Sequence, residues 1–66
     1  MNSVSLTNRE LSILKEVAAG KTTPQIAAVL GMSQETVKWY RKQMLKKFSA
    51  ATSAEMVSKA IQEHIL

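Results

Sequence analysis

The stretch SQETVKWYRKQMLKKF, residues 33–48, decides the fold of this chain and carries its charge. It holds five of the nine basic residues and one of the five acidic residues, so its charge is +4. The other four basic and four acidic residues cancel, and +4 is also the formal net charge of all 66 residues. The basic residues of the stretch are Lys38, Arg41, Lys42, Lys46 and Lys47.

The same stretch predicts a helix with two unlike faces. Ser33 is a favourable N-cap, and Glu35 lies in the first turn, where a carboxylate complements the positive end of the helix dipole. At about 100° per residue, one side gathers apolar residues and the opposite side gathers polar and cationic ones. The apolar side holds Val37, Tyr40, Met44 and Phe48; the other holds Glu35, Lys38, Trp39, Lys42 and Lys46. We expect the first to pack in a core and the second to contact nucleic acid rather than to be only a solvated surface.

Length and composition limit the possible functions. A chain of 66 residues with 45% hydrophobic and 21% charged residues predicts a single small domain, residues 1–66. It has no Cys, no Asp and one His, so it offers no disulfide framework, thiolate metal site or catalytic triad. We therefore expect no enzyme activity, no catalytic residues, no metal site and no cofactor. There is neither a bilayer-length apolar run nor a signal peptide, so we expect a cytoplasmic protein with no membrane partner.

Start and stop signals predict helices over residues 8–19, 23–30 and 53–64, in addition to 34–48. Three pairs have capping-box spacing, namely Thr7 with Glu10, Thr22 with Gln25, and Thr52 with Glu55. Gly20 and Gly31 are expected to end the first two helices in the left-handed conformation. Residues 1–5 (MNSVS) show no helical or strand period, and we expect them to lie loosely before Leu6. In the last helix the expected core residues are Met56, Val57, Ala60 and Ile61.

The link before Ser33 sets the arrangement of the central pair of helices. Only Gly31 and Met32 separate the predicted helix 23–30 from that cap, so the two helices must cross steeply. A tight link of this kind is typical of a helix-turn-helix. The predicted fold is all-α, a compact four-helix domain in which helices two and three form the helix-turn-helix and helix three is the recognition helix.

Over about residues 6–60, the chain resembles the DNA-binding domain of LuxR/FixJ/NarL-type (GerE-like) transcriptional regulators of bacteria. The resemblance rests on several short motifs in order. These are Leu6-Thr7-x-Arg9-Glu10, Gly20-x-Thr22, Ile26-Ala27-x-x-Leu30, Ser33-x-x-Thr36-Val37-Lys38, and Lys47-Phe48 where the family usually has Lys-Leu. The chain departs from the family at Tyr40 (often His), Pro24 (Lys or Arg), Ser53 (Arg) and Ser49-Ala50 (Gly-Val). We therefore expect a differently built turn after helix three and the loss of a contact made by the missing arginine.

The resemblance implies that helix three enters the major groove of DNA. Base edges are then expected to meet Lys38, Trp39 and Lys42. Phosphates are expected to meet Thr22, Thr23, Ser33, Thr36 and Lys46, together with the other two cations of the helix, Arg41 and Lys47. Helix four commonly forms the two-fold dimer contact in this family, and the outward flank expected here bears Glu55, Ser58, Lys59 and Gln62.

Individual residues keep alternative interpretations. Trp39 is equally consistent with packing against a neighbouring element and with apolar contact to a thymine methyl group or a sugar. Glu35 could accept from a cytosine amino group, but its place in the first turn already explains it. Tyr40 and Phe48 are interpreted as core residues, and His64 as an exposed side chain. Leu11 and Val29 fall outside the apolar stripes and could form a small exposed patch.

The sequence thus predicts sequence-specific binding of double-stranded DNA in bacterial transcription regulation, as the effector domain of a response regulator or as a stand-alone regulator. The expected partners are an inverted-repeat operator and a second copy of the chain on that DNA, and a contact with RNA polymerase is compatible with the role. The alternative is a protein-interaction module on a helix-turn-helix scaffold with weak or no DNA binding. A basic helix on anionic lipid is disfavoured, because Val37, Tyr40 and Met44 would have to leave the core.

Overall fold

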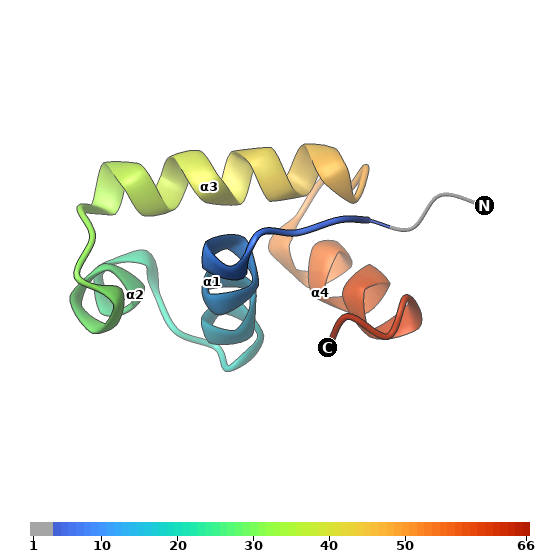
Figure 1. Ribbon diagram of the computed structural model, residues 1–66, viewed down its shortest axis with the longest axis horizontal. Coiled ribbons are helices and arrows are strands. Elements are labelled where there is room, and N and C mark those ends of the chain that lie inside the picture. Colours follow the sequence, from blue (N-terminus) through green and yellow to red (C-terminus); the bar gives the residue numbers. More distant parts are fainter. Residues whose placement is uncertain (1–3) are drawn as a thin grey trace.

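Four helices follow one another in the computed structural model, which describes residues 4–66, and that part of the chain contains no strand. They are α1 (Asn8–Ala18), α2 (Thr23–Leu30), α3 (Gln34–Lys47) and α4 (Ser53–Gln62). The predicted all-α fold is confirmed, with α1, α3 and α4 ending one or two residues before the predicted positions. In Figure 1, α3 runs along one side of the molecule, and the other three helices lie together on its opposite side.

All four helices begin with a hydroxyl cap, as the sequence predicts. The side chains of Thr7, Thr22, Ser33 and Thr52 each accept from the backbone N–H three residues later. The capping box is complete at the first two helices, where Glu10 Oε1 accepts from Thr7 N–H (3.0 Å) and Gln25 Oε1 accepts from Thr22 N–H (2.9 Å). These local pairs explain why the helix starts are where the sequence predicts them.

The third predicted capping box is wrong in one bond. Glu55 Oε1 accepts from the N–H of Ala51, at 2.7 Å, instead of from Thr52 N–H. The backbone explains the difference, since φ is −134° at Thr52 but −72° at Thr7 and −81° at Thr22. This rotation turns the N–H of Thr52 away from the helix, so the carboxylate of Glu55 accepts from the N–H of the preceding residue, Ala51.

The helix ends share one turn geometry, which corrects the expectation for the turn after α3. Gly20 and Gly31 are left-handed, with φ of 85° and 67°, and Ser49 adopts the same region at φ 52°. Ala50 N–H donates to Leu45 O at 2.9 Å, the same bond that Met32 N–H makes to Ala27 O. The turn at Ser49 is therefore built like a glycine turn, with a serine in a conformation that L-residues adopt only at a cost.

The core is formed by apolar residues from all four helices. The buried ones are Ile13, Leu14, Ile26, Ala27, Val37, Met44, Phe48, Met56 and Ala60. Tyr40 packs against this core while half-buried, so the core predictions for Tyr40 and Phe48 are both confirmed. Val4 also packs on it, which corrects the expectation that residues up to 5 lie loosely; for residues 1–3 that expectation lies outside the described residues.

One predicted core residue of α4 is not in the core. Ile61 is 56% exposed, although Met56 and Ala60 of the same helix are fully buried. Only α1 and α3 pack against α4 in the described structure, and α2 does not reach it. The flank bearing Ile61 therefore has no neighbouring helix to cover it.

Candidate nucleic-acid interface

The side of α3 that faces away from the other helices is polar and cationic. Val37, Met44 and the C-cap residue Phe48 are buried and hold the helix against the core. We call the opposite side the outer face of α3, defined by the exposed residues Glu35, Lys38, Trp39, Lys42 and Lys46. These are the residues that the helical projection places there, and Figure 1 shows that no other helix crosses this side.

Within the described residues, no carboxylate forms an ion pair with a cation of the outer face. In residues 4–66 the three ion pairs join Lys21 to Glu16, Lys47 to Glu10 and Lys59 to Glu55. Glu35 lies one turn before Lys38 but makes no ion pair with it. The ammonium groups of Lys38, Lys42 and Lys46 are therefore available to an anionic ligand.

Trp39 projects from the outer face and is 57% exposed. Its ring meets Tyr40 edge-on, with centroids 5.1 Å apart and an interplanar angle of 83°. Together with Glu35, Lys38 and Lys42 it lines a shallow hollow of about 300 Å³. Trp39 therefore packs partly against Tyr40, and more than half of its surface remains open to a ligand.

Four hydroxyl groups lie at the N-termini of α2 and α3. Thr22 and Ser33 are exposed caps, and Ser33 Oγ lies 2.8 Å from Thr36 Oγ1. Thr23 is half-buried and accepts a hydrogen bond from Arg41. A hydroxyl that only accepts can still donate its own proton, so Thr22 and Thr23 can each donate to a phosphate oxygen. In the Ser33–Thr36 pair one hydroxyl proton joins the two side chains, and the other is left for a ligand.

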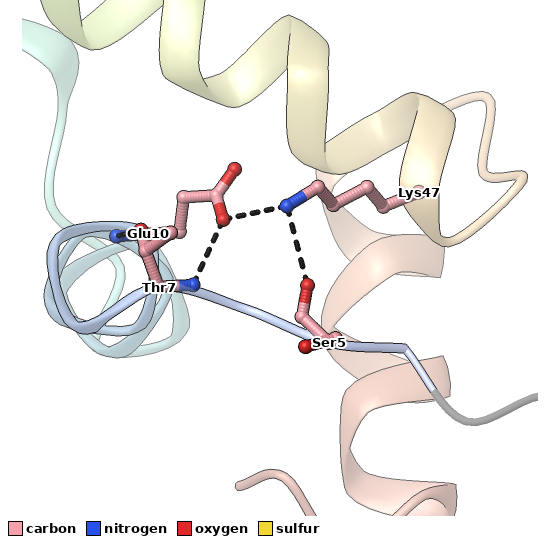
Figure 2. Close-up of polar contacts among 4 residues, drawn as sticks. All are labelled: Ser5, Thr7, Glu10 and Lys47. Atoms are coloured by element: carbon pink, nitrogen blue, oxygen red, sulfur yellow. Dashed lines mark hydrogen bonds and ion pairs between the residues drawn. The ribbon is translucent and has the colours of Figure 1, made fainter.

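Lys47 is directed away from the outer face. Its Nζ donates to Glu10 Oε1 at 2.7 Å and to Ser5 O at 3.2 Å, as Figure 2 shows. The pair joins the end of α3 to the start of α1. The structure therefore separates Lys47 from the other cations of residues 33–48.

Glu10 is the buried partner in this pair, with only 5% of its surface exposed. Burial raises the pKa of the Glu10 carboxyl, but hydrogen bonds from Lys47 Nζ and Thr7, together with the lysine charge, outweigh it and hold the pKa below its ordinary value. The sequence identifies Glu10 only as a capping residue. The sequence gives no sign that Glu10 pairs with Lys47, which lies 37 positions later in the chain.

Arg41 leaves α3 on the flank next to the outer face. Its Nη1 donates to Thr23 Oγ1 at 2.9 Å and its Nη2 donates to Ser53 Oγ. It thereby joins α3 to the first residues of α2 and α4. In the family that the sequence resembles, an arginine usually stands at the position of Ser53. Here the hydroxyl of Ser53 instead accepts a hydrogen bond from the guanidinium of Arg41.

The predicted dimer flank of α4 is partly engaged within the chain. Lys59 Nζ donates to the carbonyl oxygens of Phe48 (3.1 Å) and Ser49 (2.9 Å), and Glu55 holds the amide of Ala51. Ser58 and Gln62 are exposed, with the apolar side chain of Ile61 between them in sequence.

Comparison with known proteins gives one family. The model of the luxR family of bacterial regulatory proteins matches residues 4–60. The chain belongs to this family. Membership implies a helix-turn-helix domain that binds DNA in transcription regulation, and not an enzyme.

The relatives of this LuxR-family chain are larger regulators. It is 39% identical to the response regulatory protein YgeK of Escherichia coli over 86% of this chain and 39% of YgeK. It is 43% identical to the quorum-sensing regulator RhlR of Pseudomonas aeruginosa over 74% of this chain and 20% of RhlR. The chain thus spans about two fifths or less of the length of these relatives.

Solved structures share its fold. VqmA of Vibrio cholerae superimposes with a TM-score of 0.89 at 30% identity, over 96% of this chain and 28% of VqmA. The response regulator ChrA of a heme-sensing two-component system gives 0.91 at 26% identity, over 100% of this chain and 33% of ChrA.

The described part of this LuxR-family chain holds neither a metal site nor a membrane-spanning helix. Among residues 4–66, no three His, Cys, Asp or Glu side chains are grouped to hold a metal ion. No described helix is long and apolar enough to cross a membrane. The chemistry that the surface does offer is ammonium, guanidinium and hydroxyl donors on and beside one exposed helix.

Proposed function

We propose that this domain binds double-stranded DNA sequence-specifically, with α3 in the major groove. The observation that carries the proposal is the outer face of α3, an exposed helix side whose lysines form no ion pair with any carboxylate of residues 4–66. The major groove is about 12 Å wide and admits a helix with its side chains. At roughly 1.5 Å per residue, the 14 residues of α3 extend about 21 Å, enough to follow several base pairs.

Base edges would be contacted by Lys38, Trp39 and Lys42. A lysine ammonium donates to guanine O6 or N7, and the open part of the Trp39 ring suits a thymine methyl group or a sugar. Lys38 and Lys42 are one turn apart and both line the hollow beside Trp39, so the three can reach neighbouring bases together.

Phosphates would be contacted by Lys46 and by the hydroxyls at the starts of α2 and α3. Those hydroxyls belong to Thr22, Thr23, Ser33 and Thr36, and each helix N-terminus adds partial positive charge. Lys47 is left out of this set, because its ammonium neutralises Glu10.

Pairing on an inverted repeat would use α4. The outward flank offers Ser58, Ile61 and Gln62, an area too small for an obligate dimer interface. The neighbour VqmA is described as a dimer. We expect this domain to be a monomer in dilute solution and to pair when two half-sites hold two copies close together. A contact with RNA polymerase remains a prediction, and the function would place the protein with the nucleoid in the cytoplasm.

Selection of bound sites from a random DNA pool, followed by titration of the selected duplex at several salt concentrations, tests the proposal. We expect one recurring sequence and a log–log salt slope of about −4 per domain. Weak, salt-insensitive binding without a recurring sequence would refute it and favour the protein-interaction alternative.

A further inference from the structure

A second groove lies on the other side of the Lys38 and Lys42 ridge from Trp39. It has a volume of about 330 Å³ and gathers residues from three helices. Its lining residues are Thr23 of α2, Lys38, Arg41, Lys42 and Leu45 of α3, and Ser53 of α4. All the ionisable side chains in this lining are cations.

The guanidinium of Arg41 is held in this groove without a counter-charge. Its two hydrogen-bond partners are the neutral hydroxyls of Thr23 and Ser53, and no described carboxylate forms an ion pair with it. Both hydroxyls belong to the first residue of a helix, where backbone N–H groups carry partial positive charge. A cation fixed beside two such termini is electrostatically unfavourable until an anion joins it.

The donors in the groove match a phosphate group. Contacts with the described residues use two of the five N–H groups of the Arg41 guanidinium, which leaves three of them for a ligand. The hydroxyls of Thr23 and Ser53 accept from Arg41 and can still donate, and the ammonium groups of Lys38 and Lys42 form one wall. Arginine held by fixed partners is well suited to a phosphate, because its planar fork binds two oxygens and little side-chain entropy remains to be lost.

We infer that this groove binds one backbone phosphate of the DNA, with Arg41 as its central ligand and Thr23 and Ser53 as the groups that position the guanidinium. The inference rests on the proposed function, since the groove shares Lys38 and Lys42 with the outer face of α3. The two hollows on either side of the ridge then have different ligands. Trp39 faces a base or its sugar, and Arg41 faces the phosphate that sets the register of α3 on the duplex.

The test combines one protein substitution with single neutral phosphates. Wild type, Arg41→Gln and the control Arg9→Gln are titrated against the selected duplex and against duplexes carrying one methylphosphonate at each position in turn. Arg9 is exposed on α1, and its substitution removes the same charge. Arg41→Gln is expected to weaken binding roughly ten-fold and to reduce the salt slope by about 1, while Arg9→Gln changes neither.

The decisive observation is whether the affinity lost by neutralising one phosphate depends on the presence of Arg41. One methylphosphonate position in each half-site should weaken wild type by a similar factor and should not weaken Arg41→Gln further. If no position shows this coupling while wild type binds DNA with steep salt dependence, the inference is wrong and the proposed function stands. If wild type does not bind DNA, both fail.

Two further measurements distinguish phosphate recognition by Arg41 from a loss of folding and from binding of free phosphate. Circular dichroism melting checks that each variant is folded, and Arg41→Lys keeps the charge without the fork, so it should keep the salt slope but lose affinity. Inorganic phosphate alone is titrated by NMR against the Arg41 side-chain N–H. Weak, unsaturated shifts are expected, and saturable binding without methylphosphonate coupling would assign the groove to free phosphate and overturn the inference.

Discussion

The ion pair between Glu10 and Lys47 should respond asymmetrically to removal of either partner. The two residues differ in exposure, since 6% of the Glu10 side chain and 39% of the Lys47 side chain are accessible. If Lys47→Met removes the ammonium, the carboxylate stays buried and keeps only the hydrogen bond that it accepts from the N–H of Thr7. If Glu10→Gln removes the carboxylate charge, the ammonium left behind can be hydrated.

The magnitudes follow from these surroundings. Breaking a fully buried pair costs about 3–5 kcal/mol, and an exposed pair is worth about 0–1 kcal/mol. Because Lys47 is more than a third exposed, solvent screening reduces the upper figure, and we expect Lys47→Met to cost about 2 kcal/mol. Glu10→Gln should cost about 1 kcal/mol or less, because a glutamine can keep the bond to Thr7 N–H, as Gln25 does for Thr22.

The difference should depend on pH. The folded-state pKa of Glu10 is lowered, so its contribution is present above the unfolded pKa and is lost as pH falls through the folded value. In Lys47→Met the hydrogen bond and the charge of Lys47, both of which lower this pKa, are lost, so the pKa of Glu10 is higher than in wild type. The gap in unfolding free energy between wild type and Lys47→Met should therefore be largest near neutral pH and close below about pH 4.

Urea unfolding followed by far-ultraviolet circular dichroism measures these values, because the exposed Trp39 would be a weak fluorescence reporter of the core. The double variant Glu10→Gln with Lys47→Met completes the cycle and should be less destabilised than the sum of the single variants. Equal costs for the two single variants, or a gap that persists in acid, would refute the reasoning.

Three further outcomes are expected. Lys42→Ala should cost about 1–3 kcal/mol on the selected site and relax its specificity, whereas Lys46→Ala should weaken all sequences alike; equal losses on specific and random duplexes for both would contradict the placement of α3 in the groove. Ser49→Gly should raise the stability by about 0.5–1 kcal/mol in thermal melting, because φ at Ser49 is 52°, whereas Ala51→Gly should lower it; no gain for Ser49→Gly would contradict the cost assigned to that turn. Ultracentrifugation should show a monomer, and Ile61→Glu should remove the affinity gained from a second half-site without affecting a single half-site; a tight dimer without DNA would exclude this mode of pairing.

The parts of this structure that sequence predicts are the parts that depend on near neighbours. Caps such as Thr7 with Glu10 join residues three apart, so the helix starts follow directly from the spacing. The bond of Glu55 to Ala51 was missed, because it depends on the φ angle of Thr52. Ile61 was misplaced for a different reason, since its exposure depends on which helices reach α4.

Long-range contacts among polar side chains were beyond prediction for a related reason. The helical projection of α3 identifies which residues share its outer face, and their exposure in the structure confirms it. It does not show where a flexible cation at the edge of that face turns. Arg41 reaches hydroxyls 18 and 12 positions away, and Lys47 reaches a carboxylate 37 positions away. Both choices depend on how α1, α2 and α4 are placed around α3.

The contacts made by Arg41 and Lys47 change how much of the charge of residues 33–48 is available for binding. The sequence counts five cations and one carboxylate in this stretch, a charge of +4. Because Lys47 is neutralised by Glu10, four cations of this stretch remain on and beside the outer face of α3, and together with the carboxylate of Glu35 they give a charge of +3. At about 0.9 counterions per phosphate, four cations correspond to a salt slope near −3.6 and five to one near −4.5. Lys47→Met should thus lower the free energy of unfolding and leave the salt slope unchanged. Lys46→Ala should reduce the salt slope and leave the free energy of unfolding unchanged. Two adjacent lysines then distinguish the role of charge on α3 in folding from its role in binding.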